Sequence, residues 1–220
     1  MEYIKSVFDL IFPTKNLCYF CNEDELKIEN YICRSCRNNI EIVNKEVFLD
    51  SSFISECYYT TIYDRFMKDI IRRYKFNDKS FLYKPLGEIL LKTIYEKNLD
   101  KKVDLIAFVP SHRRKEAIRG YNQSELLAMF VSKELHIPLL KTLIKSNHTL
   151  DQHFLDKEDR KHNLKDVFKV KRKEDVEEKS ILLIDDIITS GSTMEECAME
   201  LIKNEAKAIF ALALTSSRKI

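Results

Sequence analysis

The chain has 220 residues, and its 37 lysines and arginines nearly balance its 35 aspartates and glutamates, for a net charge of +2. This balance argues against a basic nucleic-acid binder of the histone kind, and a hydrophobic content of 45% excludes global disorder. No stretch approaches the roughly 20 apolar residues of a membrane-spanning helix, and residues 1–13 lack a secretory leader and cleavage site. We therefore expect a cytoplasmic protein without a membrane span.

Residues 4–11 predict a short amphipathic helix, because apolar side chains recur there at helical spacing. Four cysteines follow in two pairs, Cys18-x2-Cys21 and Cys33-x2-Cys36. Two such pairs can supply the corners of a tetrahedral zinc site, with Zn–S distances of about 2.3 Å and no open position for catalysis. The alternative is a disulfide framework, which a chain without a secretory signal does not favour. We therefore predict a structural Zn²⁺ held by these four cysteines.

The remainder of the chain alternates short apolar strands with amphipathic helices. We expect helices over residues 64–76, 85–97, 122–136 and 193–204, and strands over residues 104–109, 181–185 and 208–214. A linker is expected over residues 41–55, and a basic loop after Pro110. The pattern predicts an α/β fold with a mainly parallel sheet, which binds ligands at the carboxyl ends of its strands. We divide the chain into residues 1–45, the N-terminal helix and zinc-binding unit, and residues 46–220, the α/β domain.

The most informative segment is ILLIDDIITSGST, residues 181–193. Two acids, Asp185 and Asp186, end a buried strand, and a hydroxyl-rich stretch around Gly191 follows where a helix begins. Backbone amides around a glycine and a helix N-terminus bind anions, whereas ionised carboxylates accept hydrogen bonds from sugar hydroxyls. We therefore expect a ribose 5-phosphate site, with both acids pointing away from the core. The spacing differs from that of a Walker A loop.

This segment resembles the motif that binds phosphoribosyl pyrophosphate (PRPP) in type I phosphoribosyltransferases, and every position of the motif matches. The resemblance implies that the two acids contact the ribose hydroxyls and that the following loop binds the 5-phosphate. The residues it assigns to PRPP are Asp185, Asp186, Ile187, Thr189, Ser190, Gly191, Ser192 and Thr193. It also implies the type I phosphoribosyltransferase-like fold, a mainly parallel sheet flanked by helices, here with a small N-terminal zinc-binding unit.

A second segment, VPSHRRKEAIRGYNQSELLA at residues 109–128, resembles the ComF branch, whose pattern is V-P…R…R-G-[FY]-N-Q…L-A. Residues 152–168 match the Q-x-x-L…R…N…F pattern of the same family, so the resemblance covers nearly the full chain. It implies a pyrophosphate loop, with Mg²⁺ bridging the leaving group, formed by Pro110, Ser111, Arg113, Arg114 and Arg119. It also makes Arg160 a candidate lid residue and, with Asp185 and Asp186, a candidate catalytic residue. The alternative interpretation of the basic segment is a solvated loop.

The ComF resemblance implies a protein that binds PRPP or a nucleotide and serves natural competence, the uptake of external DNA, alongside a helicase. Three functions stay open. The chain can be a PRPP-binding module that docks to DNA-processing partners, or an active phosphoribosyltransferase of nucleotide metabolism that transfers the pentosyl group. It can also bind single-stranded DNA directly, which the basic segment and the aromatic-rich residues 58–63 and 72–76 favour but the small net charge does not. We favour a PRPP-binding ComF protein.

Overall fold

The structure is a computed structural model, and it describes residues 17–25, 27–49, 51–76, 79–141, 143–145 and 167–217. The helix predicted at residues 4–11 lies outside these ranges. Among the helices that the structure describes, none is both long enough and apolar enough to cross a membrane.

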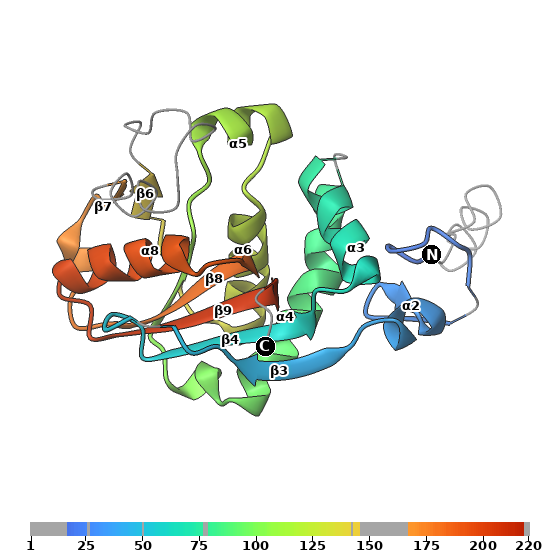
Figure 1. The fold of residues 1–220 in the computed structure, drawn as a ribbon, viewed down its shortest axis with the longest axis horizontal. Coiled ribbons are helices and arrows are strands. Elements are labelled where there is room, and N and C mark those ends of the chain that lie inside the picture. The colour runs from blue at the N-terminus through green and yellow to red at the C-terminus, as the bar shows by residue number, and fades with distance from the viewer. Residues whose placement is uncertain are drawn as a thin grey trace, which may run out of the picture.

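A five-stranded sheet forms the centre of the molecule, in the strand order β3-β4-β9-β8-β5 (Figure 1). Its strands are β3 (Ile42–Glu46), β4 (Glu56–Ile62), β5 (Leu105–Phe108), β8 (Ser180–Ile188) and β9 (Ala208–Ser216). Strands β4, β9, β8 and β5 are parallel to one another, whereas β3 pairs with β4 in the antiparallel direction at the edge of the sheet. The predicted α/β fold with a mainly parallel sheet is confirmed.

Helices cover both faces of this sheet. One face packs against α3 (Arg65–Phe76), α4 (Tyr83–Glu96) and α6 (Gln123–Leu135), and the other against α8 (Ser192–Lys203) (Figure 1). The predicted helices agree with these bounds to within two residues. Gly87 allows α4 and α6 to pack closely, because a Cβ atom at this position would lie only 2.3 Å from the ring of Phe130.

The central strand β8 is apolar on both faces because helices lie on both sides of it. Leu182 and Ile184 pack in the layer with α4 and α6, whereas Ile181 and Leu183 pack in the layer with α8. All four side chains are fully buried. This is the reason the segment is a continuous apolar run rather than an alternating one.

Several smaller elements complete the described chain. Strands β6 (Leu143–Lys145) and β7 (Phe168–Val170) form an antiparallel pair, and β7 lies beside α8. The cysteine segment forms the antiparallel pair β1 (Ile28–Glu29) and β2 (Ile32–Cys33), followed by the helix α2 (Arg34–Asn38). Short 3₁₀ turns occur at Ser80–Leu82, Leu99–Lys101 and Lys173–Asp175.

The cysteine segment packs directly on α3. The side chain of Phe20 is 1% exposed, and its ring contacts that of Phe66 with centroids 6.1 Å apart. The Phe20 carbonyl oxygen accepts a hydrogen bond from Nη1 of Arg73 at 2.5 Å. Cys18 and Ile32 belong to the same buried cluster as the side chains of α3 and α4. The segment therefore shares the core of the α/β fold, and a division between residues 45 and 46 stays a prediction.

The linker expected at residues 41–55 is wrong in its first part. Residues Ile42–Glu46 form β3, which extends the sheet by pairing Ile42 with Thr61 of β4. The burial of β3 is only partial. An edge strand of mixed polarity carries a weak strand signal in the sequence.

The basic loop expected after Pro110 is also corrected. Residues Arg113–Arg119 form the helix α5, which begins where Nδ1 of His112 accepts the N–H of Arg114 at 3.2 Å. The helix ends at Gly120, whose φ of 78° is left-handed. Its one large apolar side chain, Ile118, is 82% exposed. Helix α5 thus lacks the buried stripe on which a periodicity argument depends.

Candidate functional site

Two strand ends that are distant in the sequence lie side by side in the sheet. Strand β5 pairs with β8 in parallel register, with Phe108 opposite Ile184. The N–H of Val109 donates to the carbonyl oxygen of Ile184 at 3.0 Å. The predicted pyrophosphate loop after β5 and the two acids of β8 therefore emerge next to each other. Neighbouring carboxyl ends of parallel strands are where α/β proteins bind ligands.

Strand β8 continues beyond the predicted end at residue 185 to Ile188, so the two acids lie within it, just past the end of β5, and each carboxylate has a defined partner. Lys75, in the last turn of α3, places its Nζ 2.7 Å from Oδ2 and 3.0 Å from Oδ1 of Asp186. The hydroxyl of Ser124 in α6 donates to Oδ1 of Asp185 at 2.7 Å. Asp186 is only 6% exposed, so the expectation that both acids point away from the core is wrong for this residue. The ammonium of Lys75 compensates for the burial of its charge.

The surroundings of the two acids raise the pKa of one carboxyl group to near neutral pH. Burial, and after it the negative charge of Asp186, raises the pKa of Asp185 to about 7. The hydroxyl of Ser124, the N–H of Asp186 and the charge of Lys75 act in the opposite direction. Acids whose pKa is displaced in this way by burial and a like charge are found most often at ligand and catalytic sites.

The predicted phosphate loop leads from β8 directly into α8. Gly191 is buried and has a φ of 89°, a left-handed conformation that glycine adopts without strain. Thr189 and Ser190 are exposed. The Ser190 hydroxyl lies 3.0 Å from that of Ser192 and accepts the Ser192 N–H at 3.3 Å. The loop thus presents hydroxyl groups and a helix N-terminus on one side, an arrangement that can bind an anion.

A cavity of about 590 Å³ opens beside the predicted pyrophosphate loop. Its lining includes Pro110 and Ser111 of that loop, Asn122 before α6, and two lysines, Lys141 and Lys145. Two glutamates, Glu116 and Glu125, line it as well, and Nζ of Lys141 lies 3.1 Å from Oε1 of Glu125, so the wall carries charges of both signs. The volume is that of a small-molecule site.

Arg119 contacts other groups than the cavity. Its Nη1 donates to Oε1 of Gln123 at 3.1 Å, and its guanidinium lies 4.7 Å from the ring centroid of Phe76. Pro110 and Ser111 line the cavity, whereas Arg119 is not among the described residues that line it.

For the other predicted site residues, the structure gives only their exposure or does not describe them. Ile187 is partly buried in β8, Thr193 is exposed in the first turn of α8, and Arg114 is exposed on α5. The side chain of Arg113 and the whole of Arg160 lie outside what the structure describes. Their assignments stay predictions.

Sequence reasoning missed three residues that shape this site, namely Lys75, Asn122 and Ser124. Asn122 is 4% exposed and joins two elements. Its Oδ1 accepts the Ser124 N–H at 2.9 Å where α6 begins, and its Nδ2 donates to the Val109 carbonyl oxygen at 3.2 Å. The Asn-Gln pair within the ComF-like pattern was a usable signal for this corner. Lys75 carried none, because it is one of several basic residues in α3.

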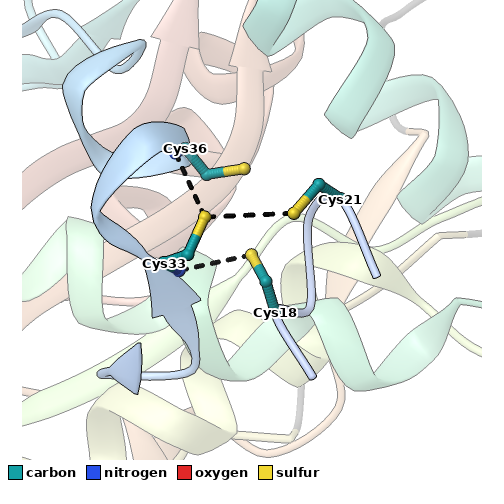
Figure 2. A group of neighbouring side chains, drawn as sticks. All are labelled: Cys18, Cys21, Cys33 and Cys36. Carbon is teal, nitrogen blue, oxygen red and sulfur yellow. Dashed lines mark hydrogen bonds between the residues drawn. The ribbon is translucent and has the colours of Figure 1, made fainter. Parts of the chain in front are cut away.

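The four cysteines meet in the N-terminal segment (Figure 2). Their Sγ atoms all lie within 4.8 Å of one another, and sulfur ligands of a tetrahedral zinc ion would be about 3.8 Å apart. Cys18, Cys33 and Cys36 are buried and Cys21 is exposed, and all four are free thiols rather than disulfides. The cluster has the donor set and the geometry to bind a metal such as zinc.

Backbone groups already favour thiolate at one corner of this cluster. The N–H of Cys33 donates to Sγ of Cys18 at 3.3 Å. Burial opposes ionisation of Cys18, but the N–H groups of Cys21, Cys33 and Phe20 outweigh it and lower the pKa of this thiol to about 7. Burial and the neighbouring cysteines raise the pKa of Cys36 instead. A bound cation would favour the thiolate at every corner.

Comparison with known proteins identifies the domain that carries the site. The family of the phosphoribosyl transferase domain matches residues 122–219, which include α6, β8, the predicted phosphate loop, α8 and β9. Among solved structures, an adenine phosphoribosyltransferase from Saccharomyces cerevisiae matches with a TM-score of 0.45 at 14% identity, covering 83% of this chain and 86% of that chain.

Of three curated relatives, one is named for DNA utilization and two are named for competence. The DNA utilization protein YhgH of Escherichia coli is 31% identical over 147 residues, which are 65% of this chain and 64% of that protein. Competence protein F of Haemophilus influenzae is 32% identical over 139 residues, 61% of either chain, so this chain spans a little less than two thirds of these two relatives. Competence protein ComFC of Bacillus subtilis is 25% identical over 219 residues, 94% of this chain and 87% of that protein. Together with the phosphoribosyl transferase domain and the four-cysteine cluster, these relatives support a ComF-family protein.

Proposed function

We propose that this protein binds PRPP where β5 and β8 end, and that it acts in the cell's handling of DNA. The observation that carries the proposal is the pair Asp185–Asp186 directly before the Gly191 loop, beside the end of β5. Ribose hydroxyls would donate to the carboxylates. The 5-phosphate would accept hydrogen bonds from the start of α8 and from the loop hydroxyls. The names of the relatives support the connection to DNA.

The pyrophosphate group would occupy the cavity beside Pro110 and Ser111. Its wall combines two lysines, Lys141 and Lys145, with two glutamates, Glu116 and Glu125, so an anionic occupant would need a cation beside it. Mg²⁺ is the expected companion, because it prefers phosphate oxygens and supplies charge neutralisation to a leaving pyrophosphate. Pentosyl transfer to an acceptor base would be a further step, for which release of pyrophosphate in the presence of added bases is the measurement.

We also propose that Cys18, Cys21, Cys33 and Cys36 hold a structural Zn²⁺. Four sulfur ligands complete a tetrahedron and leave no position for a substrate. Such a site requires reduced cysteines, and we therefore also propose that the protein is cytoplasmic, since that compartment keeps cysteines reduced. The cysteine segment, once ordered by the metal, would then offer a docking surface to a DNA-processing partner such as a helicase.

The direct test is calorimetry of the purified protein with PRPP and Mg²⁺. Replacing both acids, Asp185→Asn with Asp186→Asn, should weaken binding at least tenfold because the ribose hydroxyls lose ionised acceptors. A matched control is Asp175→Asn with Glu177→Gln, which removes the same charge near the far end of β8. Equal affinity of the wild type and the Asp185–Asp186 variant, or no PRPP binding by the wild type, would refute the proposal.

A second function, binding of single-stranded DNA, is favoured by one contact. Phe76 is 65% exposed and carries the guanidinium of Arg119 over its ring, and aromatic and arginine side chains are platforms on which unpaired bases stack. The affinity for an oligonucleotide should then fall with salt by about 0.7 logarithmic units per neutralised phosphate. Arg119→Ala should reduce that slope, whereas Arg72→Ala on the exposed side of α3 should not.

A further inference from the structure

We propose that Lys75 is a positioning residue of the PRPP site, holding the Asp186 carboxylate ionised and oriented for the ligand's sugar hydroxyls. This inference rests on the proposed function, because it is PRPP binding that assigns Asp186 to the ribose. Both oxygens of Asp186 lie within 3.0 Å of a single ammonium group. The carboxylate is almost fully buried, and the side chain of Lys75 is 21% exposed. A buried carboxylate without such a partner would take up a proton.

The end of α3 that carries Lys75 is itself held in place. The hydroxyl of Tyr74 donates to the carbonyl oxygen of Gln123 at 2.8 Å, and the hydroxyl of Tyr121 donates to the carbonyl oxygen of Tyr74. Tyr74 is fully buried. These bonds join the last turn of α3 to the start of α6, so they fix the backbone from which the Lys75 side chain reaches Asp186.

Contact with Lys75 still leaves Asp186 able to bind a ligand. Each carboxylate oxygen has two lone pairs, so it can accept from the ammonium and from a ribose hydroxyl together. The ammonium also cancels one of two negative charges at the end of β8. A ligand with several phosphate charges would otherwise meet an uncompensated acid pair, which repels it.

Among the residues that the structure describes, the titratable groups Tyr74 and Cys197, which face the two acids, have pKa values displaced away from neutral pH. Burial, and then the charge of Asp186, raises the pKa of Tyr74 well above its ordinary value. Burial, and then the charge of Asp185, does the same to the pKa of Cys197 in α8. Ser124 in α6 is not ionisable. A change in the pH dependence of binding near pH 7 therefore reports on the carboxyl pair and its ammonium partner.

The experiment compares Lys75→Met, Lys75→Arg and a control, Arg72→Met, which removes an exposed charge one turn earlier. PRPP affinity with Mg²⁺ is measured by calorimetry from pH 6 to pH 9. The charge of Lys75 lowers the pKa of Asp185, which lies at about 7, so loss of that charge should raise this pKa by roughly one unit. Lys75→Met should then bind about fivefold more weakly at pH 7 and recover by pH 9. Lys75→Arg and Arg72→Met should follow the wild type.

Two results would overturn the inference. One is a Lys75→Met protein that binds like the wild type, and the other is one weakened by the same factor at every pH, as a purely structural defect would produce. Carboxyl titration of Asp185 and Asp186 by NMR without ligand separates this inference from the proposed function. If the wild type binds no PRPP, the proposed function fails, and unmoved carboxyl midpoints in Lys75→Met overturn the role of Lys75 independently.

Discussion

The glycine of the phosphate loop offers the most quantitative test of the structure. Gly191 has a φ of 89°, and a Cβ atom built on it would lie 2.6 Å from Cδ2 of Leu49. The change Gly191→Ala therefore places an alanine in the left-handed conformation, which costs about 1–2 kcal/mol of unfolding free energy. It also displaces the end of the flexible Leu49 side chain, which costs about 1 kcal/mol. The expected loss of unfolding free energy is about 2–3 kcal/mol.

Gly120→Ala is the matched control for this change. Gly120 has a φ of 78°, but no atom lies within 4 Å of the position of its Cβ. This variant should lose only the conformational part, about 1–2 kcal/mol. The difference between the two variants isolates the contact with Leu49.

Urea unfolding followed by far-ultraviolet circular dichroism measures both variants, since the chain has no tryptophan for fluorescence. For a chain of this size, the midpoint of thermal unfolding should fall by roughly 4–12 °C in Gly191→Ala. PRPP affinity should fall in Gly191→Ala, whereas Gly120→Ala is a control for stability alone, because Gly120 lines the cavity beside the predicted pyrophosphate loop. If Gly191→Ala proves as stable as the wild type, the loop conformation described above is incorrect.

Three further predictions concern the core, pH and the metal. Gly87→Ala should lose about 1–3 kcal/mol of unfolding free energy, because its Cβ overpacks the ring of Phe130; Gly87→Ala with Phe130→Leu should recover part of the loss, and failure to recover would exclude the clash. Because the pKa of Asp185 is raised to about 7, the folded chain binds more protons than the unfolded chain between about pH 4 and pH 7, and this group's contribution to stability falls as pH rises through that window. Urea unfolding at a series of pH values should show a shallower decline in Asp185→Asn, and parallel curves would contradict the assignment. Removing the metal with a chelator should reduce hydrogen-exchange protection in the cysteine segment and in α3, while β8 and β9 stay protected. Unchanged protection in α3 would show that the stability of α3 does not depend on the cysteine segment.

The sheet and its main helices were predictable because their sequence patterns are strong. Strand β8 is a continuous apolar run, and the buried side chains of α3, Met67, Ile70, Ile71 and Tyr74, recur at helical spacing. The cysteine cluster was predictable for a different reason, since its spacing is a direct consequence of tetrahedral coordination.

What the sequence could not predict depends on contacts between distant elements. Helix α5 buries no apolar stripe, so its basic residues were expected to form a loop. The pair Lys75–Asp186 joins residues 111 positions apart, and no local pattern distinguishes Lys75 from its basic neighbours in α3. The expectation that both acids point outward failed at Asp186, because the pattern of a strand end does not show what packs over it.

Helix α3 gives a physical reason for attaching a four-cysteine segment to this fold. Arg73 donates to the carbonyl oxygen of Phe20 in that segment, and Lys75, two residues later, holds Asp186. One turn of helix thus contacts both the metal segment and the acids assigned to the ligand. Binding of a metal that orders the segment would restrict α3 and, through it, the ammonium that faces Asp186. By linkage, the coupling must be reciprocal: if zinc strengthens PRPP binding, PRPP strengthens zinc binding by the same factor.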